Sequence, residues 1–87
     1  MGKNLFMEKT DKELVVLYGQ FLKSEKEMGI PDNELGKIRD RYLEMHNPNG
    51  VLMMILDLTR TISDRWYGDK IAKDCIEKYN RMTILFL

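Results

Sequence analysis

The stretch NPNGVLMMIL, residues 47–56, decides the fold, because a turn motif stands directly before six consecutive apolar residues. Asn-Pro-Asn-Gly is a strong signal for one helix to stop and another to start. Beyond the run, apolar residues recur at the spacing of an α-helix as far as Trp66, and the alternation of a strand does not reproduce that spacing. The pattern predicts a helix over residues 51–67.

Two further breaks, GIPD at 29–32 and GD at 68–69, divide the rest of the chain into helical segments. Thr10 and Glu13 form a capping-box pattern, and Asp32 and Asp69 stand where N-caps are expected. In the first segment the predicted core stripe is Leu14, Val15, Tyr18, Phe21, Leu22 and Met28. The predicted helices span about residues 11–28, 33–46, 51–67 and 70–84, and residues 83–87 are either helix or a short strand.

Short turns between helices of this length require antiparallel neighbours. The 87 residues therefore predict a single all-α domain over residues 1–87, a small antiparallel four-helix bundle. The variant is three helices with the fourth docked on, or exchanged with, a second copy.

The composition excludes several classes of partner and compartment. Lys plus Arg and Asp plus Glu are balanced at 14 each, so no net field holds the whole molecule on nucleic acid or on an anionic membrane. Cys75 is the only cysteine, which excludes an intrachain disulfide and favours a reducing compartment. The longest apolar run is far below the roughly 18 residues that span a bilayer. We expect a cytoplasmic protein with no membrane association.

The inventory for catalysis is poor. With one histidine and one cysteine, the usual zinc ligand sets cannot form within one chain. We expect no catalytic residues, no metal and no cofactor, and hence no enzyme. Glu25 is an unusual charged residue, because it falls within the apolar stripe of the first helix. It reaches solvent, pairs with Arg39, or serves as a ligand-binding or catalytic carboxylate; a dyad of Cys75 and His46 is a further, weaker enzymatic reading.

Residues around the first turn resemble the helix-turn-helix family of DNA-binding proteins. The resemblance rests on the apolar and glycine pattern of Met28, Gly29, Ile30, Leu35 and Ile38. It implies that residues 32–46 form a recognition helix, with Lys37, Arg39 and Arg41 facing the DNA. The chain departs from the family at Glu25, where a small residue is wanted, and Asp40 and Glu44 interrupt the basic face.

The first half of the helix over 51–67 is apolar nearly all round. Taking 100° per residue, Val51 and Ile55 lie on the core face, Met54 and Leu56 flank it, and Met53 points away. A helix of this kind is either central or covered by a partner, and no helix is central in an isolated four-helix bundle. A symmetric dimer would cover the exposed side. The alternative is that NLFM at 4–7 or TILFL at 83–87 folds back over it.

These patterns predict a small protein-protein interaction module that regulates, links or inhibits another protein, as a homodimer. The alternative function is a helix-turn-helix DNA-binding regulator. The predicted protein interface contains the residues Val51, Met53, Met54, Leu56, Val16, Leu17 and Tyr67.

Overall fold

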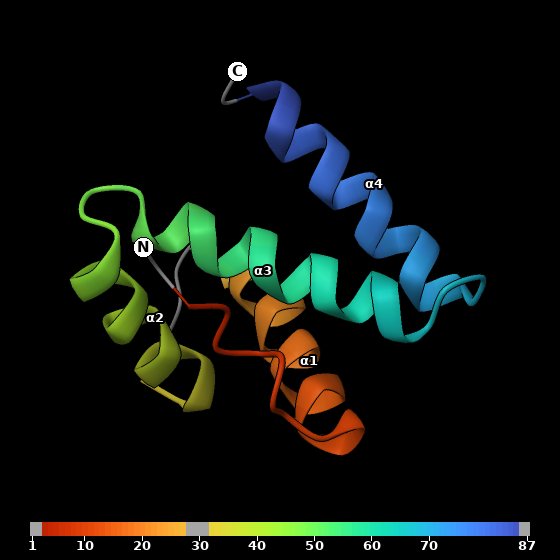
Figure 1. Ribbon diagram of the computed structural model, residues 1–87, viewed down its shortest axis with the longest axis horizontal. Helices are drawn as coiled ribbons and strands as arrows, with labels where there is room; N and C mark the ends of the chain where they lie inside the picture. The colour runs from red at the N-terminus through yellow and green to blue at the C-terminus, as the bar shows by residue number, and fades with distance from the viewer. Residues whose placement is uncertain (1–2, 28–31, 86–87) are drawn as a thin grey trace.

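The computed structural model describes residues 3–27 and 32–85, which form an all-α fold. Its helices are α1 (Asp11–Glu27), α2 (Glu34–Met45), α3 (Gly50–Arg65) and α4 (Lys70–Leu85) (Figure 1). Consecutive helices pack antiparallel, and the Cα radius of gyration of 12.2 Å is that of a compact domain of this length. The predicted all-α four-helix architecture is confirmed, and residues 83–85 belong to α4 rather than to a strand.

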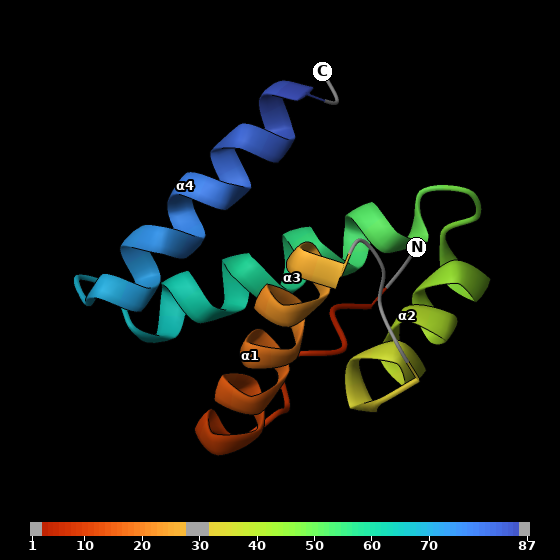
Figure 2. The same ribbon diagram turned by 180° about the vertical axis from the view of Figure 1, so that it is seen from behind.

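Helix α3 is central. It lies between α4 on one side and α1, α2 and the N-terminal segment on the other, as both views show (Figures 1 and 2). Within the described residues, α4 brings its backbone close to no helix except α3. The expectation that no helix is central is therefore wrong. Helix α4 diverges from the start of α3, and the run at 51–56 is only partly buried: Met54 is buried, Val51 is exposed and the other four residues are half-buried (Figures 1 and 2).

The buried face of α3 differs from the predicted one. Met54, expected beside the core face, is fully buried, and Met53, expected to point away, packs half-buried against the core. Val51, expected on the core face, has 36% of its surface exposed. The buried residues of α3 are Gly50, Met54, Leu58, Thr59, Thr61 and Ile62, so the buried face is turned relative to the predicted apolar stripe.

Helix α1 is turned in a similar way. Its buried residues are Leu14, Leu17, Tyr18, Phe21 and Ser24. Leu17, predicted at an interface, is therefore core, whereas Val15 and Leu22, predicted as core, are exposed. The face turns because α1 packs against α2 and α3, while the backbone of α4 stays away from it.

The helix starts follow local hydrogen bonds. The capping box is confirmed, since the Thr10 amide donates to Glu13 Oε1 (3.0 Å) and the Glu13 amide to Thr10 Oγ1 (3.1 Å). The N-cap of α2 is Asn33, whose Oδ1 accepts from the Gly36 amide, rather than Asp32 as predicted. Asp32 instead pairs with a guanidinium of α2. The predicted stop at 28–31 lies outside the described residues.

The N-terminal segment folds back over the junction of α2 and α3. Phe6 is fully buried and stacks on Tyr42, with ring centroids 5.9 Å apart. The Tyr42 hydroxyl accepts from the Leu5 amide (3.0 Å) and donates to Asp57 Oδ2 (2.6 Å). The NLFM segment therefore does fold back on the core, but its hydrogen bonds and ring contact are with Tyr42 and Thr61 rather than with the 51–56 run that the alternative named. It lands one turn beyond the 51–56 run, and Asn4 there donates to the buried Thr61 hydroxyl.

Gly50 lets α3 start against α2. A Cβ atom at this position would lie 2.6 to 2.7 Å from backbone atoms of Leu43 and Tyr42, and real Cβ contacts are not that short. The glycine of the NPNG motif therefore fixes how closely the two helices approach. The motif does more than end α2.

The turn into α4 is short. Gly68 has φ of +94°, a backbone conformation that glycine adopts at low cost, and the Asp69 carbonyl accepts from the Lys73 amide as α4 begins. Over residues 70–82 of α4, Ala72 and Cys75 are buried. No helix among the described residues is long and apolar enough to cross a membrane.

Candidate functional site

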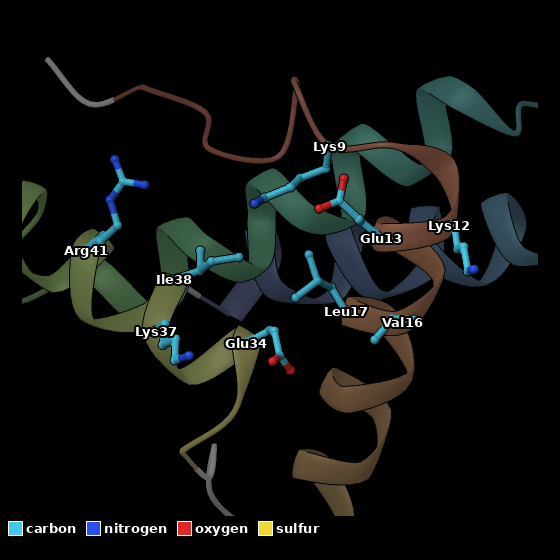
Figure 3. Close-up of a pocket in the computed structure, with 9 residues that line it drawn as sticks. All are labelled: Lys9, Lys12, Glu13, Val16, Leu17, Glu34, Lys37, Ile38 and Arg41. Carbon is cyan, nitrogen blue, oxygen red and sulfur yellow. The ribbon is translucent and has the colours of Figure 1, made fainter.

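A groove of about 430 Å³ lies between α1 and α2 (Figure 3). Its floor is apolar and consists of Val16, Leu17 and Ile38, with the Leu17 and Ile38 side chains directed toward the space between the helices. Charged side chains surround the floor on both walls. They are Lys9, Lys12, Glu13, Glu34, Lys37 and Arg41.

Helical geometry places these side chains. Lys12 and Val16 are four residues apart on α1, and Lys37 and Arg41 are four apart on α2, so each pair shares one helix face. Of the floor residues, Leu17 and Ile38 belong to the core, while Val16 has 50% of its surface exposed. Val16 is therefore the apolar side chain most available to a ligand.

Gln20 joins α1 to α2 beside Glu34, which lines the groove. Its side-chain amide donates to Glu34 Oε2 (3.1 Å) and its carbonyl oxygen accepts from the Leu35 amide (3.0 Å). One side chain thus ties α1 to the start of α2. The donated hydrogen bond also lowers the pKa of the Glu34 carboxyl, and Lys37 adds to this effect.

One end of the groove is basic and open. Lys9 reaches across this end and Arg41 stands on the facing wall (Figure 3). Lys9, Glu13 and Arg41 also line a second hollow of about 290 Å³, which runs on toward the N-terminal segment at Lys3. The pKa of Glu13 is lowered, first by the Thr10 amide and then by the Thr10 hydroxyl and Lys9.

The groove carries an excess of positive charge. Four of its lining residues are basic and two are acidic, and both acids are held by neutral hydrogen-bond donors of the chain. None of Lys9, Lys12, Lys37 and Arg41 forms an ion pair in the described part of the chain. Because the whole chain has no net charge, this concentration is local.

The predicted protein interface is not gathered into one surface. Val16 and Leu17 line the groove, while none of the predicted residues of α3 does. Val51 lies exposed at the start of α3, Leu56 is half-buried, and Tyr67 is 84% exposed in the turn before α4. Met54 is fully buried in the core, so its prediction as an interface residue is wrong.

The basic residues predicted to contact DNA fall into two groups. Lys37 and Arg41 line the groove. Arg39 lies apart from them and pairs with Asp40 (2.9 Å) and Asp32 (3.5 Å). The structure thus does not bring the three together on one face of α2.

Glu25 has a partner that the sequence reasoning did not name. Its carboxylate accepts from Lys78 Nζ of α4 at 3.0 and 3.3 Å, and it remains partly exposed. The same ammonium lies 5.8 Å from the ring centroid of Phe21, a cation–π geometry. Pairing of Glu25 with Arg39 is therefore wrong, and the carboxylate links α1 to α4.

Cys75 and His46 share no contact. The Cys75 thiol is fully buried, and burial raises its pKa. His46 is the C-cap of α2 and stacks on Tyr42. Over residues 3–27 and 32–85 there is no group of three or more histidine, cysteine or acidic residues that could hold a metal ion.

Sequence reasoning missed Lys9, Lys12 and Glu34 as site residues, and it used Glu13 only as a cap. The four-residue spacing of Lys12 and Val16 indicates that the two side chains share one face of α1. It gains meaning only when α1 and α2 are placed side by side, because the groove contains residues from both. No protein-family model, curated protein or solved structure matches the chain.

Proposed function

We propose that this protein is a non-catalytic interaction module that regulates, links or inhibits another protein by holding a segment of it in the groove between α1 and α2. The observation that carries the proposal is an apolar floor between two walls whose basic side chains form no ion pair within the described residues. Grooves between helices are a common docking site for a partner's helix, whose apolar side chains fill the space between the two walls.

The chemistry of the lining favours binding over catalysis. Its carboxyl groups are Glu13 and Glu34, and hydrogen bonds lower the pKa of both. A general acid at neutral pH needs a raised pKa, so these two carboxylates are suited to holding charge rather than to donating protons. The cytoplasm, where a lone buried thiol stays reduced, is the expected compartment.

Val15 and Val16 provide a matched test. They are neighbours on α1 with nearly equal exposure, 52% and 50%, but only Val16 lines the groove. Peptides are first selected on the protein from a displayed library of amphipathic helices. We expect Val16→Asn to weaken the selected peptides about tenfold and Val15→Asn to leave them within about twofold. Both changes are neutral, so the comparison does not depend on charge.

Three results would count against the groove. They are a library that yields no binder, binders that are insensitive to Val16→Asn, and binders that respond equally to both substitutions. Circular dichroism and denaturation of each variant check that the fold is kept. We expect it to be kept, because both positions are exposed.

Self-association stays a prediction, and the burial of α3 favours a dimer less than the apolar run at 51–56 alone does. The dimer was inferred from surplus apolar surface at 51–56, and α3 proves to be central, with Val51 as the one large exposed apolar residue of that run. Molar mass from light scattering over a concentration series tests it. A stable dimer that Val51→Glu converts into a folded monomer would restore this interface.

A further inference from the structure

The groove between α1 and α2 has a direction. Gln20 bridges the two helices beside Glu34, while Lys9 and Arg41 mark one end. At that end the groove joins the hollow that leads toward the N-terminal segment. An elongated ligand therefore fits between α1 and α2 and is free to continue past Lys9 and Arg41.

The charges stand on both walls rather than at one point. Lys12 flanks the floor on α1, and Lys37 and Arg41 flank it on α2 (Figure 3). A helix with an apolar stripe between two rows of carboxylates matches the basic side chains of both walls, whose own two carboxylates, Glu13 and Glu34, accept hydrogen bonds from within the chain. An acyl chain with a single anionic head would match only one end, and it would leave the charged walls beside hydrocarbon.

Resting on the function proposed above, we infer that the occupant of the groove is an acidic amphipathic helix of another protein. Its apolar stripe covers Val16, Leu17 and Ile38. Its flanking carboxylates face the basic side chains of the two walls, which form no ion pairs among the described residues, although Lys9 lies near Glu13 and Lys37 near Glu34.

The expected strength follows from the exposure of these charges. A solvent-exposed ion pair contributes about two- to fivefold in affinity. Several such pairs together should therefore contribute about tenfold. Salt screens such pairs, and the preference for an acidic helix should shrink as ionic strength rises. The contribution of the apolar stripe should not shrink with it.

The test uses the same helical library, with the positions beside its apolar stripe drawn from Glu, Gln and Lys. We expect selected sequences to be rich in Glu at those positions. Three synthetic peptides with one shared stripe and Glu, Gln or Lys flanks are then compared by fluorescence anisotropy at low and high salt. The Glu peptide should bind about tenfold more tightly than the Gln peptide at low salt, and the Lys peptide most weakly.

Paired charge variants locate the effect. In the double variant Lys37→Gln with Arg41→Gln, the Glu peptide should lose most of its advantage while the Gln peptide keeps its affinity. The control is Lys70→Gln with Lys73→Gln on α4, where both side chains are exposed and lie outside the groove. That variant should bind the Glu peptide like the unaltered protein.

The failures are distinguishable. Equal selection of Glu, Gln and Lys, with binding that still requires Val16, would overturn the acidic partner and leave the interaction module in place. Recovery of no binder, or binders insensitive to Val16→Asn, would overturn the module itself. Displacement of the Glu peptide by duplex DNA or by oleate at equal or lower concentration would overturn the choice of a protein segment.

Discussion

The two sides of α3 are covered in different ways. On one side, α2 and the N-terminal segment approach closely, with Gly50 against the backbone of α2 and a polar network centred on the Tyr42 hydroxyl. On the other side, α4 buries Ala72 and Cys75 and reaches α1 only through side chains. The Tyr18 hydroxyl, also buried, lies beside the Cys75 thiol of α4 and makes no hydrogen bond to a nitrogen or oxygen atom. Stability should therefore be concentrated on the side of α2, where packing is close and polar groups are paired.

The largest expected effect comes from Phe6→Ala. Removing a fully buried ring that stacks on Tyr42 should lower the free energy of unfolding by about 4 kcal/mol, measured by urea denaturation. Met7→Ala is the control, since Met7 is the next residue and is 68% exposed. Its effect should be within about 0.5 kcal/mol. Similar losses for both would show that the N-terminal segment is not part of the core.

Gly50→Ala should be nearly as damaging. The added methyl group meets backbone atoms of Leu43 and Tyr42, which cannot turn aside as a side chain could, and we expect a loss of about 3 kcal/mol. Gly19→Ala places a methyl on exposed α1 with nothing within 4 Å, and it should stabilise by about 0.5 to 1 kcal/mol. A neutral Gly50→Ala would mean that α2 and α3 lie further apart than described.

A pair of tyrosine variants compares the two sides directly. Tyr42→Phe leaves the Asp57 carboxylate and the Leu5 amide without their partner and should cost about 2 kcal/mol. Tyr18→Phe removes a buried hydroxyl whose polar neighbour is the Cys75 thiol, a weak hydrogen-bonding group, so it should cost less than about 0.5 kcal/mol. Thermal and urea unfolding of both variants measure the difference. Equal costs would mean that the polar network does not distinguish the sides.

The smallest effect is expected for Lys78→Gln. The ion pair with Glu25 is partly exposed, so its loss, together with the contact to Phe21, should cost less than about 1 kcal/mol. Lys73→Gln, an exposed change on the same helix, is the control. A loss well above that of the control would show that this one side chain holds α4 in place.

Much of the fold could be predicted from the sequence, because helix starts and stops depend on neighbouring residues. The capping box at Thr10 and the helix stop before Gly68 are local signals, and both hold. The rotation of the buried faces could not be predicted in this way. Whether Met54 or Leu17 is buried depends on which helix packs beside it. Apolar periodicity alone does not contain that information.

The candidate site was predicted only in pieces. Val16 and Leu17 were named for a protein interface and Lys37 and Arg41 for DNA, and the structure places all four around one groove. Their common location follows from the packing of α1 on α2. The chain's net charge does not reveal this basic cluster, because acidic residues elsewhere balance it to zero.

The most direct test of the groove is a map of backbone amide chemical shifts, recorded on the labelled protein while a selected peptide is added. The account predicts that the largest shifts fall on the first half of α1 and on α2, around Val16, Lys37 and Arg41. Shifts concentrated instead on α4 and on residues 51–56 would contradict it, and would return the binding surface to the first half of α3.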